Sequence, residues 1–127
     1  MAEQDRSSDQ PGSPRIVVVG PCASGKTTLV RGLRRLGYDA AVCGQEHSDI
    51  PTLWRHTGPD IVIALHAELA TIRQRRGSAW PEWLYHRQNE RLTSAREAAS
   101  IRIDTSRLAP GDEVSLGTVS FIFDIEQ

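Results

Sequence analysis

Cysteines and long hydrophobic runs are scarce in this sequence. The 127 residues include two cysteines, Cys22 and Cys43, and they form no C-x-x-C pair. The spacing therefore indicates neither a zinc site nor a disulfide framework. The longest apolar run, residues 61–65, is far shorter than the roughly 20 residues of a membrane helix. The N-terminus also lacks the basic and apolar regions of a secretory signal. We expect a soluble cytoplasmic protein with no membrane partner.

A strong charge of either sign is absent too. The formal net charge is -1, and 24% of the residues are charged. Proteins that bind duplex DNA or an anionic membrane usually carry a marked positive charge, so we do not expect nucleic acid as a partner. The cationic side chains number 15, and Lys26 is the single lysine among them.

The length favours one ordinary domain, because a chain near 150 residues buries roughly two-thirds of its unfolded surface. Residues 1–14 hold no large apolar side chain after Met1 and are rich in Ser, Pro, Gln and charge. This composition predicts a disordered leader. We assign residues 15–127 to a single domain, in which no internal repeat is found.

Apolar periodicity predicts strands that alternate with helices. Strands are expected at residues 16–19, 40–43, 61–65 and 100–104. Helical segments are expected at residues 29–36, 51–56, 67–76 and 81–98. The tail, residues 111–123, fits either a helix or an alternating strand, and we favour the helix. Such alternation is typical of an α/β fold, a parallel sheet with helices on both faces.

Ligands of such sheets bind beyond the carboxyl ends of the strands, and a phosphate-binding motif stands at the first of these ends. The segment from Gly20 to Thr27 reads G-x-x-x-x-G-K-[ST] and lies between the strongest strand and the best amphipathic helix. Its backbone N–H groups and the helix dipole would hold phosphate oxygens. The predicted nucleotide-binding residues of the loop are Gly20, Pro21, Cys22, Ala23, Ser24, Gly25, Lys26, Thr27 and Thr28.

Three side chains of this motif have separate expected roles. Lys26 would reach the β and γ phosphates of a bound triphosphate, and Thr27 would be a Mg²⁺ ligand. Thr28 would bond the α phosphate.

On this motif the chain resembles the P-loop nucleoside-triphosphate-binding proteins. The N-K-x-D motif by which GTPases bind guanine cannot occur with one lysine, so the resemblance narrows to the small P-loop kinases, adenylate-kinase-like and gluconate-kinase-like. It extends from Arg15 to Phe123. Four further features are similar to a group of short bacterial AAA or kinase-like ATP-binding proteins: the Q-E-H-S run of residues 45–48, Trp54, the segment of residues 76–84 and the I-D-T-S run of residues 103–106. The resemblance implies a three-layer α/β/α fold with about four strands in the order 2-3-1-4, and ATP and Mg²⁺ as cofactors.

The resemblance also implies an arginine-rich segment that closes over the triphosphate. Residues 73–91 contain five arginines, and a planar guanidinium binds phosphate oxygens bidentately. We predict Arg73 and Arg76 as catalytic, with Arg76 also binding the nucleotide. The alternative is a solvated helix face whose arginines pair with Glu82, Glu90 and Glu97.

Two further positions follow from the resemblance. Thr105 comes after the fourth strand, where a similar segment of nucleotide kinases passes the adenine base. His66 stands at the end of an apolar strand where related ATPases carry a magnesium-binding aspartate. The acidic residue that would bind magnesium is therefore left open: it is either Glu68, two residues later, or a residue from elsewhere in the chain. A hydrogen-bonded histidine at a strand end is the simpler interpretation of His66.

The acceptor side is predicted after the second strand, where Gln45 to Asp49 are all polar. A carboxylate that orients a hydroxyl and accepts its proton assists phosphoryl transfer. Glu46 and Asp49 are the candidates, and we favour Glu46 because Asp49 also suits an N-cap for the short helix that follows. His47 would suit an anionic substrate.

These features predict a Mg²⁺-dependent kinase that transfers the γ-phosphoryl group of ATP to an unidentified small-molecule or nucleoside-type acceptor. The alternative is a nucleotide-dependent switch or binding module without such an acceptor. A kinase acting on nucleic-acid ends is a third, less favoured reading because of the net charge.

Overall fold

A four-stranded parallel sheet forms the centre of the structure, a computed structural model that describes residues 13–109, 112–116 and 119–122. The strands are β1 (Arg15–Val19), β2 (Asp39–Val42), β3 (Ile61–His66) and β4 (Ile101–Asp104). Their spatial order is β2-β1-β3-β4, and all three pairings are parallel. The α/β prediction is thus confirmed, and the predicted leader lies almost wholly outside the described residues.

The predicted strand order 2-3-1-4 is wrong, because β1 rather than β3 is the neighbour of β2. Between β2 and β3 the chain forms two 3₁₀ turns, η2 (Gln45–His47) and η3 (Leu53–Thr57), in place of a further strand. β2 therefore lies directly beside β1, and the chain crosses β1 to reach β3. The connections leave β1 and β3 in opposite directions, so the switch point of the sheet lies between these two strands.

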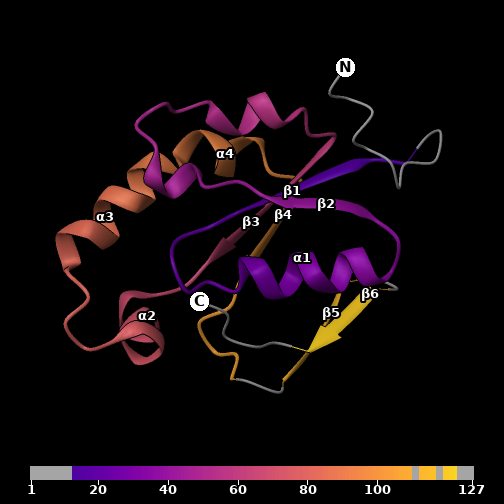
Figure 1. The fold of residues 1–127 in the computed structure, drawn as a ribbon. Coiled ribbons are helices and arrows are strands. Elements are labelled where there is room, and N and C mark those ends of the chain that lie inside the picture. The colour runs from indigo at the N-terminus through magenta and orange to yellow at the C-terminus, as the bar shows by residue number, and fades with distance from the viewer. Residues whose placement is uncertain (1–12, 110–111, 117–118, 123–127) are drawn as a thin grey trace.

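Helices and turns cover both faces of the sheet (Figure 1). α1 (Lys26–Arg35) lies on one face, where Leu29, Val30 and Leu33 pack against Ile16 and Val18. η3 and α4 (Thr93–Ala98) lie on the other face, and α3 (Glu82–Arg91), which precedes α4, packs against η2. There Val17, Val19, Trp54, Leu92 and Ala95 form a second buried cluster. The layers therefore stack as helix, sheet, helix.

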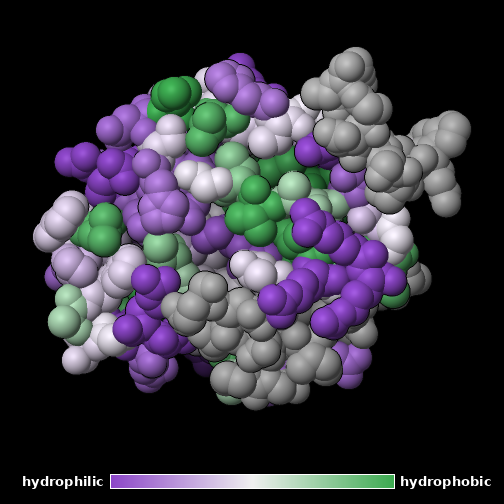
Figure 2. All heavy atoms as spheres, viewed as in Figure 1, coloured by the Kyte–Doolittle hydropathy of each residue, from purple (hydrophilic) through white to green (hydrophobic). Residues whose placement is uncertain are grey.

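The outer side of α1 is hydrophilic (Figure 2), and its arginines Arg31, Arg34 and Arg35 are exposed. α2 (Leu69–Arg76) follows the carboxyl end of β3. The predicted single helix over residues 81–98 is divided into α3 and α4 at Leu92, whose side chain is fully buried. Among the described residues, no helix is both long and apolar enough to cross a membrane.

The tail is a hairpin rather than the helix that we favoured. β5 (Glu113–Leu116) pairs antiparallel with β6 (Val119–Ile122) in a separate two-stranded sheet. Alternation over residues 118–123 is the pattern of a strand, and the pairing of β5 with β6 agrees with this pattern. The hairpin lies beside α1 (Figure 1).

Candidate functional site

The loop from Gly20 to Gly25 joins β1 to α1 at the switch point of the sheet. Two of its residues adopt positive φ angles, 63° at Ala23 and 101° at Gly25, which is the N-cap of α1. Glycine tolerates this left-handed conformation at no steric cost, whereas alanine rarely adopts it. The chain is thereby folded back on itself, with Ser24 N–H donating to the Pro21 carbonyl at 3.2 Å.

Gly20 is required by close packing at the base of the loop. A Cβ atom at this position would lie 2.6 Å from Ser24 Oγ and 3.0 Å from the Leu65 carbonyl oxygen of β3. The Ser24 hydroxyl is buried and has no hydrogen-bond partner in the part of the chain that the structure describes. A buried hydroxyl without a partner is unusual, so the loop retains one polar group that its own fold does not satisfy.

Lys26 is turned inward over the loop. Its ammonium donates to the carbonyl oxygens of Gly20 and Pro21, both at 2.9 Å, and lies 3.0 Å from Glu46 Oε2. The side chains of Lys26 and Glu46 are only 10% and 4% exposed. An ammonium has three protons, and these three acceptors use all of them. The structure therefore brings together two residues that the sequence analysis selected on separate grounds.

Glu46 is held in η2, the turn that follows β2. The backbone carbonyl of Glu46 accepts a hydrogen bond from Arg91 at 3.2 Å, and Oε2 lies 3.4 Å from His47 Nε2. The other carboxylate oxygen, Oε1, is buried and has no hydrogen-bond partner within the described residues. Asp49 is instead 78% exposed and accepts a hydrogen bond from Arg91 Nε at 2.9 Å. Glu46, not Asp49, is thus the carboxylate at the loop.

Gln88 of α3 holds Cys22 of the loop in place through two hydrogen bonds. Its Oε1 accepts the Cys22 N–H at 3.1 Å, and its Nε2 donates to Cys22 Sγ at 3.3 Å. Gln88 is 1% exposed. The sequence analysis missed this residue, although a glutamine on the inner side of a helix is a signal that could have found it.

Arg75 braces the loop from the opposite side. It donates to the carbonyls of Ala23 at 2.8 Å, Thr105 at 2.6 Å and Leu108 at 3.1 Å. Burial lowers the pKa of its guanidinium. Arg75 lies four residues after buried Thr71 and so shares the inner face of α2. Its role was not predicted from the sequence, because its partners lie 30 to 52 residues away.

Thr105 takes part in the same brace. Its hydroxyl donates to the Ser24 carbonyl at 2.9 Å, so this residue contacts the loop itself. Thr28 is buried, whereas Thr27, in the first turn of α1, is exposed.

The arginines predicted to close over a triphosphate make other contacts. Arg73 Nε donates to the Trp80 carbonyl at 3.0 Å, and the exposed Arg76 stacks its guanidinium on the Trp80 ring at 5.1 Å. Arg87 lies 3.9 Å from Glu90 on the surface of α3. These contacts match the expected solvated-face alternative for Arg87, while Arg73 and Arg76 hold the segment between α2 and α3.

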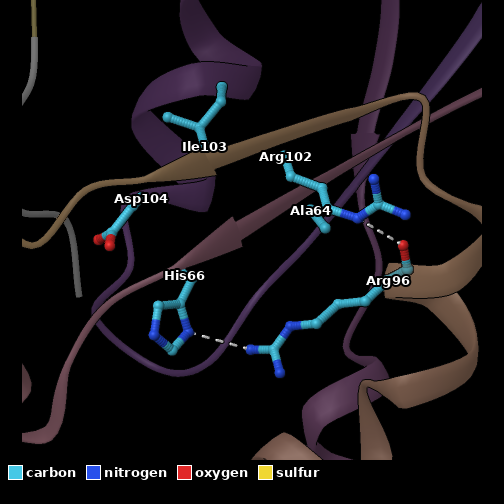
Figure 3. Close-up of a pocket in the computed structure, with 6 residues that line it drawn as sticks. All are labelled: Ala64, His66, Arg96, Arg102, Ile103 and Asp104. Carbon is cyan, nitrogen blue, oxygen red and sulfur yellow. Dashed lines mark hydrogen bonds between the residues drawn. The ribbon is translucent and has the colours of Figure 1, made fainter.

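His66 lies in a cavity of about 370 Å³ at the end of β3 (Figure 3). The cavity is lined by Ala64, His66, Arg96, Arg102, Ile103 and Asp104. Arg96 lies 3.3 Å from His66 Nδ1 and donates to Asn89 at 2.6 Å. Burial first, and then Arg96, lower the pKa of His66. The simpler interpretation of His66, a hydrogen-bonded strand-end histidine, is confirmed.

No protein-family model and no curated protein matches this chain. The chemical capacity of the site therefore follows from its own contacts. A buried carboxylate, an ammonium and a loop of positive-φ residues meet at the N-terminus of α1, where the helix dipole favours an anion.

Proposed function

We propose that the loop binds ATP with Mg²⁺ and that the protein transfers the γ-phosphoryl group to a small hydroxylated or phosphorylated acceptor. The observation that carries this proposal is the position of Lys26. Its ammonium lies over the loop at the N-terminus of α1, and its three bonds go to two loop carbonyls and the Glu46 carboxylate. A triphosphate offers the same ammonium stronger, charged acceptors.

Binding then exchanges one set of partners for another. Lys26 leaves the Gly20 and Pro21 carbonyls for phosphate oxygens, and the loop N–H groups face the same anion. The Ser24 hydroxyl, unpartnered among the described residues, gains a partner if a phosphate oxygen comes within reach. Binding of a triphosphate would thus supply hydrogen-bond partners that the loop now lacks.

The oxygen ligands that Mg²⁺ prefers are present beside the loop. The Thr27 hydroxyl is exposed in the first turn of α1, and Glu46 retains a carboxylate oxygen with no partner in the described chain. A Mg²⁺ ion held there would supply positive charge that neutralises the charge developing on the transferred phosphoryl group. We assign these two residues, not His66, to hold it, because His66 faces Arg96 (Figure 3).

Glu46 also serves the acceptor in this proposal, because its carboxylate orients the hydroxyl and accepts its proton. A general base contributes about 10²- to 10⁴-fold to a rate. A transfer screen with ATP, Mg²⁺ and pooled nucleosides, sugars and organic acids tests the proposal. We expect one acceptor class to be phosphorylated, and Glu46→Gln to lose at least about 100-fold in transfer rate.

Asp49→Asn is the matched control, since Asp49 pairs with Arg91 at the surface. This variant should retain transfer within about threefold, because an exposed ion pair contributes little. Equal losses in the two variants would remove Glu46 from its assigned role. No transfer to any acceptor, with ATP bound, would leave the kinase proposal wrong and the loop assignment intact.

One observation favours a second candidate, a nucleotide-dependent switch. Arg75 connects α2 to the Ala23 carbonyl, so a change in the loop is transmitted directly to the arginine-rich segment. ATP should then increase hydrogen-exchange protection of residues 73–91 in the absence of turnover. Unchanged protection with bound ATP would contradict the switch.

A further inference from the structure

Three potential metal ligands meet above the loop. They are Cys22 Sγ from the loop, and a carboxylate oxygen of Glu46 and a ring nitrogen of His47 from η2, and these atoms all lie within 4.8 Å of one another. The sulfur and the imidazole nitrogen are 3.9 Å apart, and this nitrogen lies 3.4 Å from the carboxylate oxygen. The cluster joins residues that are 25 positions apart in sequence, so no local spacing reveals it.

These distances are close to those of a tetrahedral zinc site. Zinc bonds of about 2.3 Å to sulfur and 2.0–2.2 Å to nitrogen and oxygen place sulfur and nitrogen about 3.6 Å apart, and nitrogen and oxygen about 3.4 Å apart. The sulfur–nitrogen distance of 3.9 Å has to shorten by a few tenths of an ångström, and the nitrogen–oxygen distance of 3.4 Å already fits. His47 has a 64% exposed side chain, so it can adjust and a metal can enter past it.

The donor types select the metal. Thiolate and imidazole ligands favour Zn²⁺ and similar transition metals, whereas Mg²⁺ prefers oxygen. Three protein ligands leave the fourth tetrahedral position open to water or another ligand.

The groups around the cluster already support a metal-bound form. Gln88 donates to Cys22 Sγ, and such a bond stabilises a thiolate and orients it. Arg91 anchors the Glu46 backbone. Glu46 is 3% exposed, and its Oε1 is buried with no partner within the described residues. A buried carboxylate with an unused oxygen is an independent indication that this site accepts a cation.

We propose that Cys22, Glu46 and His47 bind one Zn²⁺ ion, and that this ion competes with Lys26 for the Glu46 carboxylate. A zinc–sulfur bond forms as the S–H bond breaks, and the thiol proton passes to solvent. No atom is oxidised or reduced. The cluster occupies the loop, so the bound ion opposes triphosphate binding; this last clause alone rests on the proposed function.

Cobalt titration of the full chain, purified without a histidine tag, tests the site. Co²⁺ bound to a thiolate gives an intense near-ultraviolet charge-transfer band. The band should saturate at one Co²⁺ per chain and disappear when Zn²⁺ displaces the cobalt. It should be lost in Cys22→Ser and retained in Cys43→Ala, which keeps the loop thiol. A band that persists in Cys22→Ser would overturn the proposal.

The histidine ligand has a matched control. His47→Gln should weaken Co²⁺ binding at least about tenfold, whereas His56→Gln, an exposed position on η3, should leave it unchanged. Equal affinity of the two variants would exclude His47 as a ligand. Circular dichroism and thermal unfolding of each variant verify the fold, and Zn²⁺ should raise the melting temperature of the wild type but not of Cys22→Ser.

Lys26→Met separates this proposal from the nucleotide site. Removing an ammonium 3.0 Å from Glu46 Oε2 should strengthen Co²⁺ binding, by about fivefold or more, because like charges no longer compete. The same variant should lose ATP. Weaker Co²⁺ binding contradicts the metal site, whereas retained ATP binding contradicts only the nucleotide proposal.

Discussion

Two charged sites lie at the carboxyl end of the same sheet, and their polar groups are satisfied to different degrees. We call them the loop site (Ser24, Lys26 and Glu46) and the His66 pocket (His66 and Arg96). In the loop site, Ser24 Oγ and Glu46 Oε1 are buried and unpartnered within the described residues. In the His66 pocket, Arg96 donates to Asn89 and faces His66 (Figure 3).

This difference favours the loop site over the His66 pocket as the place for a ligand. A buried polar group without a partner costs about 1–3 kcal/mol, and a bound ligand that supplies the partner removes that cost. A guanidinium that already donates to a neighbouring amide, as Arg96 does to Asn89, has fewer N–H groups left for a ligand. Judged by cationic side chains alone, the His66 pocket would be the better candidate for binding an anion. The unpartnered polar atoms favour the loop site instead.

The largest expected effect is on ATP affinity, and it distinguishes a substitution of Lys26 from a substitution of Arg96. Lys26→Met should weaken ATP binding at least about 100-fold, because hydrogen bonds to charged groups contribute about 1.5–3 kcal/mol each. Arg96→Met should change ATP affinity by about twofold or less. Isothermal titration with ATP and Mg²⁺ measures both. Comparable losses in the two variants would remove the distinction between the sites.

The brace behind the loop is tested next. Arg75→Met leaves the Ala23, Thr105 and Leu108 carbonyls without this donor. We expect about 2–4 kcal/mol lower stability in urea unfolding. Arg76→Met, which removes an exposed cation–π contact with Trp80, should lower stability by about 0.5–1 kcal/mol. Equal losses would show that Arg75 does not brace the loop.

Close packing beneath the loop gives a smaller effect. In Gly20→Ala the new Cβ meets Ser24 Oγ and the Leu65 carbonyl, so we expect about 1–3 kcal/mol of destabilisation. Gly44→Ala is the control: its Cβ would meet only His47, at 3.9 Å, and stability should change by about 0.5 kcal/mol or less. Thermal unfolding compares the two, and a tolerated Gly20→Ala would mean that the loop base is loosely packed.

The smallest effect concerns pH and the His66 pocket. Burial and Arg96 lower the pKa of His66 in the fold, against the opposing charges of Asp104 and Glu68. Below about pH 6.5 the unfolded chain therefore binds more protons at His66 than the folded chain does. Stability falls as pH drops through that range. His66→Gln should lose less stability than the wild type between pH 7 and 5, and identical pH profiles would contradict this.

Local sequence patterns predicted the parts of the fold and site that depend on neighbouring residues. One continuous stretch of sequence predicted the strand before Gly20, the loop and α1, because glycines mark where the strand and the helix end. Glu46 was predicted as a carboxylate that follows a strand. The strand order, the partner of Glu46 and the brace by Arg75 depend on contacts between distant segments. These contacts leave little mark on local spacing.

The hairpin illustrates the same limit. Residues 111–123 fit two periods, and what decides between them is the packing of β6 beside α1, which no short window contains. In the arginine-rich segment, neighbouring residues of α2 point to opposite sides of the helix, so their roles could not be predicted together. Arg75 braces the loop while Arg76 is exposed on Trp80.

Lys26 should exchange the Gly20 and Pro21 carbonyls for the oxygens of a bound triphosphate while it stays beside Glu46, and the composition makes this exchange directly observable. The chain contains one lysine, so protein grown with lysine labelled only at the side-chain nitrogen gives a single side-chain nitrogen NMR signal, which reports Lys26 alone. The account predicts that this signal shifts in Glu46→Gln and that, in the wild type, it shifts on addition of ATP and Mg²⁺ and saturates at one nucleotide per chain. A signal that remains unmoved at millimolar ATP would contradict it.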